Sequence, residues 1–413
     1  MSVWPIVRYR LSDKNLRSAI GFGLGLRLHR SACRAAADNQ TANTLMKVLG
    51  LASYPVESAT TRYRLQQFVG PLAKHGLSLT VSPLISSSTF RTLYQRRALV
   101  RTALTLLKSA LMRLGVVLLL KQSDVVLVQR EAMIFGPPVF EWLAARVFKR
   151  PLVLDLDDAT YVPYTSPTYG KFGQALKWFR KTDDLIRWAS VVTCGNRAIA
   201  EYVESKGAIA RIIPTVVDTD VFAPRPRVSN GPLVLGWIGT HSTFPYLQTV
   251  FPVLQDLAKT HSFKLKIVGA GVDAVHISGV EVENREWKLE REVADFQSFD
   301  VGLYPIDPSL YAEKWAAGKS GFKAIQYMAV GIPFVAAPVG AMADIGEAGV
   351  THFAASSHDE WYRRLESLLA NVQLRQTMGA AGRRHVVVHY SLADQADRLA
   401  RALKEAVGMQ RAD

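Results

Sequence analysis

Short apolar runs, each the length of one buried strand, alternate with amphipathic helical segments along almost the whole chain from Met46. Alternation of this kind predicts parallel strands covered by helices on both faces of a sheet. The runs expected to form a first sheet are 47–52, 77–81, 125–129, 152–156, 191–194 and 211–213. The helices expected between them include 62–75, 138–148 and 177–189.

A polar, turn-rich stretch at 224–231 interrupts this alternation, which then restarts. The expected strands of the second part are 233–238, 264–268, 280–282, 301–304, 334–336 and 352–354. The expected helices are 244–260, 288–296, 322–330, 358–371 and 374–389. The sequence therefore predicts an α/β protein with two Rossmann-like, doubly wound parallel-sheet domains that face a cleft. We expect these domains at 46–226 and 227–390, with a helix at 391–413 that packs back towards the first.

Residues 1–45 differ from the rest and are expected to be a disordered or dispensable N-terminal extension. Their apolar stretch at 19–26 is broken by Arg27 and followed by further basic residues, which fits a signal peptide poorly. The chain contains no uninterrupted apolar run of about 18 residues, so no membrane span is expected. Its only cysteines are Cys33 and Cys194, which favours a reducing compartment such as the cytoplasm.

The positive charge of the chain is concentrated in its first third. Residues 1–150 hold 22 Lys and Arg against 6 Asp and Glu, a net +16, whereas the whole chain carries +15. Such an excess indicates an anionic partner, either a membrane surface or nucleic acid, or simply a solubilising surface. Because no RNA- or DNA-binding motif is present, we expect no nucleic-acid partner.

A basic, amphipathic helix is predicted within 91–121. At helical spacing, Arg97, Arg101 and Lys108 lie together. The apolar stripe directly beside them consists of Leu104, Leu107, Leu111, Leu114 and Leu118. This pattern suits an enzyme that docks on an anionic membrane, which we expect to be the inner face of the cytoplasmic membrane. It suits equally a core helix with one wet face.

The segment 318–340 carries the densest chemical signal. It predicts a helix over 322–330, ended by Gly331 in a left-handed conformation. The residues before and at the helix start are Gly318, Lys319, Ser320, Gly321 and Lys323. Unpaired backbone N–H groups and two lysines at a helix N-terminus favour binding of a diphosphate. The alternative is an ordinary helix–strand connection with solvated lysines.

From Met328 to Pro333 this segment resembles retaining GT-B glycosyltransferases of the large group-1 class. In that family, an acidic residue, seven others and a second Glu precede the motif M-A-x-G-x-P-V. The first acidic position falls on Gly318, and the second, which contacts the donor ribose, falls on Gln326. The chain is similar to a subgroup with K-x-x-F-K ahead of Q-Y-M-A, which implies that lysines bind the phosphates. The weaker matches, in the family's order, are 213–222, 235–240, 299–305 and 379–383.

The resemblance implies a nucleotide-diphosphate sugar as donor, bound by the second domain. The loop of Gly239, Thr240 and His241 matches the phosphate loop of the family but lacks its usual Arg and Lys. We expect the backbone N–H groups of Gly239 and Thr240 to be available to phosphate. With Lys319 and Lys323 present, we expect neither a metal nor another cofactor.

Candidate acceptor residues lie in the first domain. Asp157 and Asp158 follow a buried strand, and carboxylates there could contact acceptor hydroxyls, hold a metal ion, or only cap a loop. Tyr54, Arg62 and Arg64 could meet an anionic acceptor such as a lipid phosphate, or form a solvated helix face. No nucleophile is evident, so Asp157, Asp158 and His241 are the catalytic candidates.

The resulting prediction is an enzyme, a hexosyltransferase-like glycosyltransferase acting with retention of configuration. The expected acceptor is a glycan or lipid-linked hydroxyl, and the expected role is in bacterial envelope or exported polysaccharide synthesis. Two alternatives remain open: a sugar-nucleotide epimerase, and a non-catalytic homologue that binds nucleotide sugar. The missing acids at Gly318 and Gln326 favour the latter of these two.

Overall fold

The computed structural model describes residues 45–92, 105, 108–111, 113–163, 174, 176–226, 231–271, 274–307, 309 and 313–412. Leu45–Asp413 cluster as one compact unit. The expected extension at 1–45 lies outside the described residues apart from its last residue, and so do residues 227–230 of the turn-rich stretch. In the described part of the chain, no helix is both long enough and apolar enough to cross a membrane.

The first sheet has six parallel strands in the order β2-β1-β3-β4-β5-β6. The strands are β1 (Met46–Ala52), β2 (Leu77–Pro83), β3 (Val125–Gln129), β4 (Leu152–Leu156), β5 (Val191–Cys194) and β6 (Ala210–Ile212). Every residue of β3, β4 and β5 is buried, as expected for the central strands of a sheet covered on both faces. These three strands match the predicted ranges residue for residue.

Two apolar layers cover the first sheet. On one face, Val48, Val125 and Val153 pack with Leu72 and, from the far end of the chain, with Leu403. The helices of this face are η1 (Gln66–Phe68), α2 (Val69–Ala73) and α17 (Leu392–Ala412). The helix before them, α1 (Ala59–Arg64), packs its Tyr63 with apolar residues of the second half instead. The other face is covered by α5 (Val116–Gln122), α6 (Val139–Trp142), the π-helical turn η3 (Leu143–Val147), α8 (Lys181–Trp188) and α9 (Arg197–Ser205).

The second sheet also has six parallel strands, in the order β12-β11-β10-β7-β8-β9. The strands are β7 (Leu233–Ile238), β8 (Phe263–Val268), β9 (Glu281–Arg285), β10 (Val301–Tyr304), β11 (Phe334–Ala336) and β12 (Phe353–Ala354). Counted from β7, this is the strand order of a dinucleotide-binding Rossmann sheet. The predicted α/β class with two doubly wound sheets is therefore confirmed.

Helices cover both faces of the second sheet as well. One face packs against α10 (Phe244–Gln248), α11 (Phe251–Ala258) and α15 (His358–Ala370). The other packs against α12 (Glu292–Gln297), α14 (Phe322–Ala329) and α16 (Val372–His389). Shorter elements of this half are η4 (Leu289–Arg291), α13 (Glu313–Ala317) and η6 (Gly340–Ala343). Gly331 has φ 72°, which confirms the left-handed residue expected after α14.

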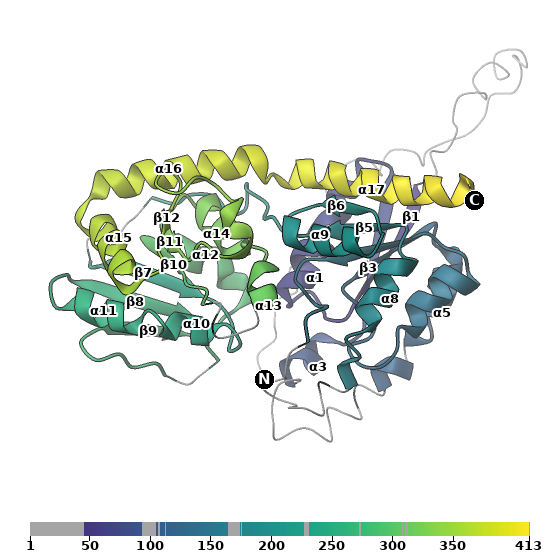
Figure 1. Cartoon of the computed structure of the whole chain (residues 1–413), viewed down its shortest axis with the longest axis horizontal. Helices are drawn as coiled ribbons and strands as arrows, with labels where there is room; N and C mark the ends of the chain where they lie inside the picture. Colours follow the sequence, from purple (N-terminus) through teal and green to yellow (C-terminus); the bar gives the residue numbers. More distant parts are fainter. Residues whose placement is uncertain are drawn as a thin grey trace, which may run out of the picture. The chain divides into compact units, whose positions relative to one another are not determined.

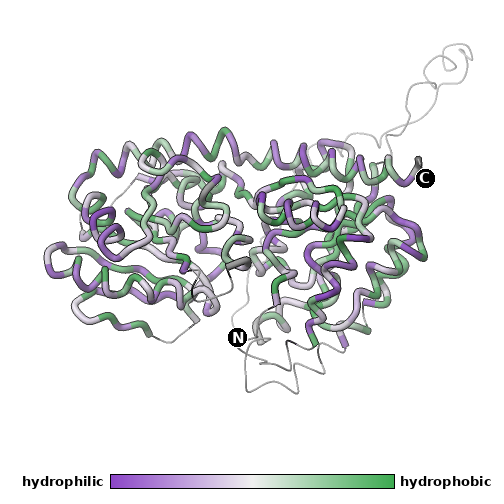
Figure 2. The backbone as a smooth tube through the Cα atoms, in the orientation of Figure 1, coloured by the Kyte–Doolittle hydropathy of each residue, from purple (hydrophilic) through white to green (hydrophobic). Residues whose placement is uncertain are grey.

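The last two helices connect the two sheets. α16 contacts α14 and α15 of the second half, whereas α17 contacts α2, β3, β4 and β5 of the first (Figure 1). Hydrophilic and hydrophobic residues alternate along both helices (Figure 2). The buried apolar residues of α17 are Ala396, Leu399, Ala400, Ala402, Leu403, Ala406 and Val407.

Several predicted helices are shorter or divided in the structure. The helix expected at 62–75 consists of α1, η1 and α2, with Leu65 between them at φ −126° and ψ −60°. The helix expected at 244–260 is divided into α10 and α11, and each has a proline at its first or second position. Proline lacks the N–H that would continue an earlier helix, which explains a new start at Pro252.

The predicted amphipathic helix falls largely on residues that are not described, among them Arg97, Arg101, Leu104 and Leu107. The described part ends in α5, and α3 (Ser87–Thr92) lies before it. Leu111, Leu114 and Leu118 have 59%, 58% and 68% of their surface exposed. A stripe of leucines in a protein core would be buried, so these three leucines of the predicted stripe do not form one.

Candidate active site

Each sheet reverses its strand order once, between β1 and β3 in the first and between β7 and β10 in the second. In doubly wound sheets, ligands bind outside the carboxyl ends of the strands at such a reversal. Ser53 follows β1 and Arg130 follows β3, while Gly239 follows β7 and Pro305 follows β10. The polar residues around these strand ends form the candidate site.

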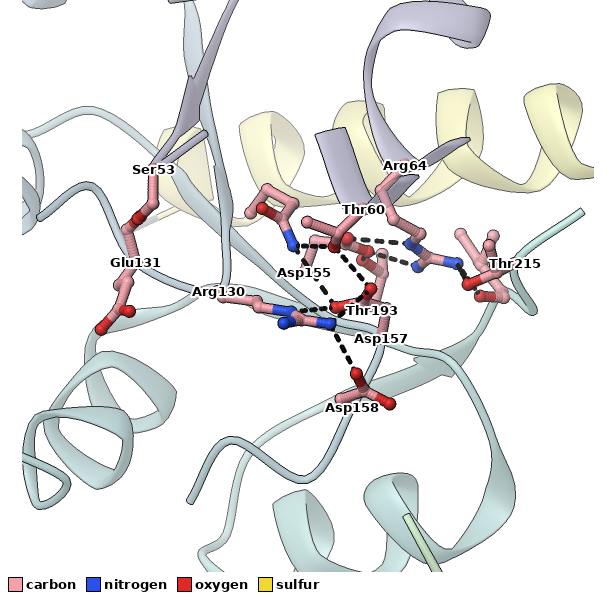
Figure 3. Close-up of polar contacts among 12 residues, drawn as sticks. Ser53, Thr60, Arg64, Arg130, Glu131, Asp155, Asp157, Asp158, Thr193 and Thr215 are labelled. Atoms are coloured by element: carbon pink, nitrogen blue, oxygen red, sulfur yellow. Dashed lines mark hydrogen bonds and ion pairs between the residues drawn. The ribbon is translucent and has the colours of Figure 1, made fainter. Parts of the chain in front are cut away.

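Arg130 pairs with both acids that follow β4 (Figure 3). Its Nε donates to Asp157 Oδ1 at 2.5 Å, and its Nη2 donates to Asp157 Oδ2 at 2.8 Å and to Asp158 Oδ2 at 2.7 Å. Arg130 has φ 59°, in the left-handed region that residues other than glycine rarely adopt. The strand end is therefore shaped to bring this guanidinium onto the two carboxylates.

Both carboxylate oxygens of Asp157 are occupied. Besides Arg130, Oδ2 accepts from Thr60 Oγ1 at 2.5 Å and Oδ1 accepts from Gln129 Nε2 at 3.3 Å. Burial by itself raises the pKa of Asp157, but the charge and hydrogen bonds of Arg130, aided by Arg64 and Thr60, lower it to about 2. Asp157 is thus a buried, ionised group with its hydrogen-bonding capacity filled from within the protein.

Asp158 is more open. Its Oδ2 accepts from Arg130, whereas its Oδ1 has no hydrogen-bond partner among the described residues. The side chain is 21% exposed, against 8% for Asp157. The sequence treated the two acids as equivalent candidates, and the structure separates them into a saturated carboxylate and one with an available oxygen.

Arg64 is buried in a separate ion pair. Its Nε donates to Asp155 Oδ2 at 2.9 Å, Nη2 pairs with the other oxygen of Asp155, and Nη1 donates to the Ile213 carbonyl at 2.6 Å. Thr193 Oγ1 also donates to Asp155, at 2.5 Å. Arg64 is only 3% exposed. Its side chain therefore offers almost no surface to an acceptor, contrary to the expectation from the sequence.

Tyr54 and Arg62 lie nearer the surface. The Tyr54 ring packs edge-on against Phe90 at 5.7 Å, and its carbonyl accepts from Thr61 Oγ1 at 2.8 Å. Arg62 Nη2 donates to Glu292 Oε2 at 2.9 Å, which joins α1 of the first half to α12 of the second. Contact of either residue with an acceptor stays a prediction.

The loop before α14 meets the first half of the chain directly. A Cβ on Gly318 would overlap the Cβ of Ala159, which follows Asp158. Asn196 Nδ2 donates to the Lys319 carbonyl at 3.1 Å. Gly321 precedes the helix with φ 64°, as the left-handed turn there requires. The predicted donor loop and the Asp157–Asp158 loop are therefore in contact.

The two lysines of this loop have different surroundings. Lys319 Nζ lies 4.6 Å from the centre of the Trp315 ring, a cation–π contact. Lys323 Nζ donates to Gln326 Oε1 at 3.0 Å and lies 5.4 Å from the centre of the Phe296 ring. Burial lowers the pKa of Lys323 to about 8, although Glu292 acts in the opposite direction.

Glu292 links these groups to α1. Its Oε2 accepts from Tyr63 Oη at 2.7 Å as well as from Arg62, and its Oε1 lies 3.5 Å from Gln326 Nε2. Burial and the charge of Glu292 raise the pKa of Tyr63. A chain of polar contacts therefore runs from Lys323 through Gln326 and Glu292 to Arg62 and Tyr63.

The loop after β7 corrects one expectation. The Gly239 N–H donates to the Val268 carbonyl at 3.0 Å, and the Thr240 N–H donates to Thr243 Oγ1 at 3.0 Å. Neither N–H is unpaired, because the sheet and a local turn use them. His241 is exposed and packs against Gly271, where a Cβ would approach the His241 Cβ to 2.7 Å.

The contributors to the site that the sequence reasoning missed include Arg130, Thr60 and Glu292. Arg130 could have been found, because it follows an apolar strand just as Asp157 does, and adjacent parallel strands end at the same edge. Glu292 gave no such signal. In the described part of the chain, no three His, Cys, Asp or Glu side chains form a group that could hold a metal ion.

A family model described as Glycosyl transferase-like matches residues 252–401. Among curated proteins, none matches the sequence. HepE of Anabaena, solved with UDP-glucose, is similar with a TM-score of 0.62 and 16% identity, over 87% of this chain and 99% of that one. Sucrose-phosphate synthase of Thermosynechococcus elongatus is similar with a TM-score of 0.61 and 13% identity, over 88% and 100%.

The lipopolysaccharide outer core galactosyltransferase WaaB is similar with a TM-score of 0.51 and 13% identity, over 86% of this chain and 98% of that one. At these identities the solved structures establish the fold. The predicted enzyme class is confirmed at the level of the matched domain. The chain thus has the GT-B fold, and its residues 252–401 match a glycosyl transferase-like family model.

Proposed function

We propose that the protein transfers a sugar from a nucleotide-diphosphate sugar to a hydroxyl group, with retention of configuration. The observation that carries this proposal is the contact between the two halves at their strand ends. Ala159 packs on Gly318, and Asn196 holds the Lys319 carbonyl. An acidic cluster of the first sheet therefore lies beside the lysine-bearing loop of the second, so groups able to accept from a hydroxyl are next to groups able to bind a diphosphate.

The donor is assigned to the second half. Lys319 and Lys323 flank the start of α14, where the helix dipole also favours negative charge. HepE, which shares the fold, was solved with UDP-glucose, and this supports a nucleotide sugar as the donor. We infer that the two lysines, without a metal ion, stabilise the charge that develops on the diphosphate.

In the proposed reaction, the bond between the anomeric carbon and the donor phosphate breaks, and a bond from the acceptor oxygen forms on the same face of the sugar. The proton of the acceptor hydroxyl passes to an oxygen of the departing phosphate. The protein supplies orientation and charge stabilisation, which are large contributions when groups are held in place beforehand. No nucleophilic side chain is needed.

The proposed acceptor is a glycan or a lipid-linked hydroxyl at the inner face of the cytoplasmic membrane, in envelope or exported polysaccharide synthesis. Exposed Leu111, Leu114 and Leu118 lie near the exposed side chains of Lys108 and Lys121. Apolar and basic groups together favour an anionic bilayer surface. WaaB, which shares the fold, acts on the lipopolysaccharide outer core, as its name states.

Nucleotide binding and turnover test this function. Isothermal titration in EDTA with UDP, GDP, ADP and their glucose or mannose derivatives should show binding of one nucleotide family. Lys319→Ala should weaken it by about tenfold or more, equivalent to ~1.4 kcal/mol. Lys259→Ala, at an exposed lysine that directly follows α11, is the matched control and should bind as the wild type does.

Release of nucleoside diphosphate from the bound sugar nucleotide then separates an enzyme from a non-catalytic binder. Octyl glucoside can serve as a simple acceptor. Binding without release would support the non-catalytic alternative, and conversion of the sugar nucleotide into its epimer would support an epimerase. Failure of every nucleotide to bind would refute the proposed function.

A further inference from the structure

Arg130 has a backbone conformation that must be held by its surroundings. Its φ of 59° lies in the left-handed region, which disfavours a side chain such as arginine and is concentrated at functional sites. The residue stands at the carboxyl end of β3, beside the reversal of the first sheet. Its guanidinium makes three hydrogen bonds to two successive carboxylates.

Asp157 provides the fixed side of this arrangement. Four hydrogen bonds reach its two oxygens, from Thr60, Gln129 and twice from Arg130. Its hydrogen-bonding capacity is filled, and its side chain is 8% exposed. Asp157 is therefore suited to holding Arg130 and is unsuited to contacting a substrate.

Asp158 provides the open side. One of its oxygens accepts from Arg130, while the other has no partner among the described residues (Figure 3). Ala159, the next residue, packs on Gly318 of the proposed donor loop. Asp158 also lies close to Tyr304, at the end of β10. Burial raises the pKa of Tyr304, and the negative charge of Asp158 raises it further. Its available oxygen therefore belongs to the region where the two sheets meet.

Two adjacent carboxylates repel each other, and without a cation between them the more exposed one would turn towards bulk water. The planar guanidinium removes this repulsion and fixes both groups in one geometry, which a lysine ammonium cannot do. Fixing an acceptor oxygen in advance strengthens its hydrogen bond with a substrate hydroxyl, because little order is lost on binding.

We propose that Arg130 is a positioning residue, held by Asp157, that sets Asp158 so that its second oxygen accepts a hydrogen bond from a sugar hydroxyl. That hydroxyl belongs either to the donor sugar or to the acceptor. This role rests on the proposed function. It divides the acidic pair into one residue that holds Arg130 and one that touches the substrate.

The test uses the full-length chain and the variants Arg130→Gly, Arg130→Lys, Asp158→Asn and the double variant Arg130→Gly/Asp158→Asn. Glycine adopts a φ of 59° without strain, so Arg130→Gly removes the guanidinium without straining the backbone at this position, although it leaves Asp157 without its ion-pair partner. Thermal unfolding of each variant verifies that it is folded. The probes are UDP, GDP and ADP, their glucose or mannose derivatives, and octyl glucoside as acceptor.

If Asp158 contacts the donor sugar, Arg130→Gly and Asp158→Asn lose the additional affinity for sugar nucleotide over free nucleotide. If it contacts the acceptor, both affinities persist and turnover falls by about tenfold or more, as expected for a lost charged hydrogen bond. In both cases the double variant should lose no more affinity or turnover than Asp158→Asn alone. The losses are not additive because Arg130 acts through Asp158. Added methylguanidinium should partly restore the lost affinity or turnover of Arg130→Gly but not that of the double variant. Arg130→Lys should keep only part of the wild-type affinity or turnover.

Unchanged affinity and turnover in Arg130→Gly would overturn the assignment. So would additive losses in the double variant, or a loss of free-nucleotide binding as large as the loss of sugar-nucleotide binding. A wild-type protein that binds no nucleotide would instead refute the proposed function, and this role of Arg130 with it.

Discussion

At the scale of single residues, identical side chains in one loop have different roles because their neighbours differ. Lys319 and Lys323 are both basic residues beside one helix start, and the sequence assigned them one task. Lys319 lies over the Trp315 ring, whereas Lys323 is directed to Gln326 among aromatic residues. Burial lowers the pKa of Lys323 to about 8.

This difference predicts a pH dependence for nucleotide binding. The pKa of Lys323 is lowered, so its ammonium form is complete well below pH 8 and is lost as the pH rises through about 8. Because a diphosphate is attracted to the charged form, its affinity should fall by about tenfold per pH unit above that value. Titration calorimetry from pH 7 to pH 9.5 measures this fall.

Lys323→Arg is the matched control, because a guanidinium stays charged throughout this range. It should bind with little pH dependence, and Lys323→Met should bind weakly at every pH. A wild-type affinity that does not change between pH 7 and pH 9.5 would exclude Lys323 from the diphosphate site.

At the scale of elements, periodicity located apolar faces but did not say what covers them. The leucines before and within α5 have helical spacing, which fits a core stripe and a membrane surface equally well. In the structure Val116 and Leu120 are buried in the core of the first sheet, whereas Leu114 and Leu118 are exposed. The same short segment therefore contributes both to the core and to the surface.

The exposed leucines predict binding to anionic vesicles. Burying a leucine in an apolar phase contributes about 1.5–3 kcal/mol, so Leu114→Ser/Leu118→Ser should reduce the vesicle-bound fraction by about tenfold or more. Flotation with phosphatidylglycerol-containing vesicles measures this, and vesicles of phosphatidylcholine alone should bind more weakly because of the basic charge.

Val372→Ser/Val388→Ser is the control for this experiment. These valines are 57% and 62% exposed and belong to α16, on the other half of the chain. Equal loss of binding in both double variants, or no binding of the wild type to anionic vesicles, would contradict the membrane proposal.

At the scale of the whole molecule, the two halves are joined by contacts that no local pattern encodes. α17 completes the apolar layer on the first sheet, although it follows the second in the sequence. Arg62 and Tyr63 of α1 both donate to Glu292, which is 4% exposed. Gln326 then connects this carboxylate to Lys323.

Removing the charge of Glu292 should therefore weaken the whole fold. In Glu292→Gln, Arg62 keeps its charge and loses its ion-pair partner, which should lower the free energy of unfolding by about 1–3 kcal/mol. Chemical denaturation followed by fluorescence measures the change. Glu290→Gln, two residues earlier and exposed, should differ little from the wild type. Equal stability of the two variants would show that the Arg62–Glu292 pair does not stabilise the molecule.

Much of the fold could be predicted because its signals are local. The runs that became β3, β4, β5, β7, β10 and β11 were located to the residue, since an apolar run of only three to six residues is too short for a buried helix and favours a buried strand. Helix bounds were less certain, because breaks such as Leu65 depend on what each turn packs against.

The site could be predicted only in part. The sequence indicated which loops follow the strands, and it identified Asp157, Asp158 and the lysine loop. It could not say which of Arg62 and Arg64 is buried. The two residues are two positions apart on one helix and therefore point in different directions, but the sequence does not show what either side chain meets. The structure buries Arg64 against Asp155, while Arg62 reaches Glu292.

The sequence by itself determined the order of strands and helices and the left-handed position at Gly331, because backbone conformation depends on near neighbours. Only the tertiary structure decided which charges pair. Arg64 and Asp155 are 91 residues apart in the chain, and Arg62 and Glu292 are 230 apart. Such pairs form only after the sheets have brought distant strand ends together, and an isolated pattern of residues contains no information about that distance.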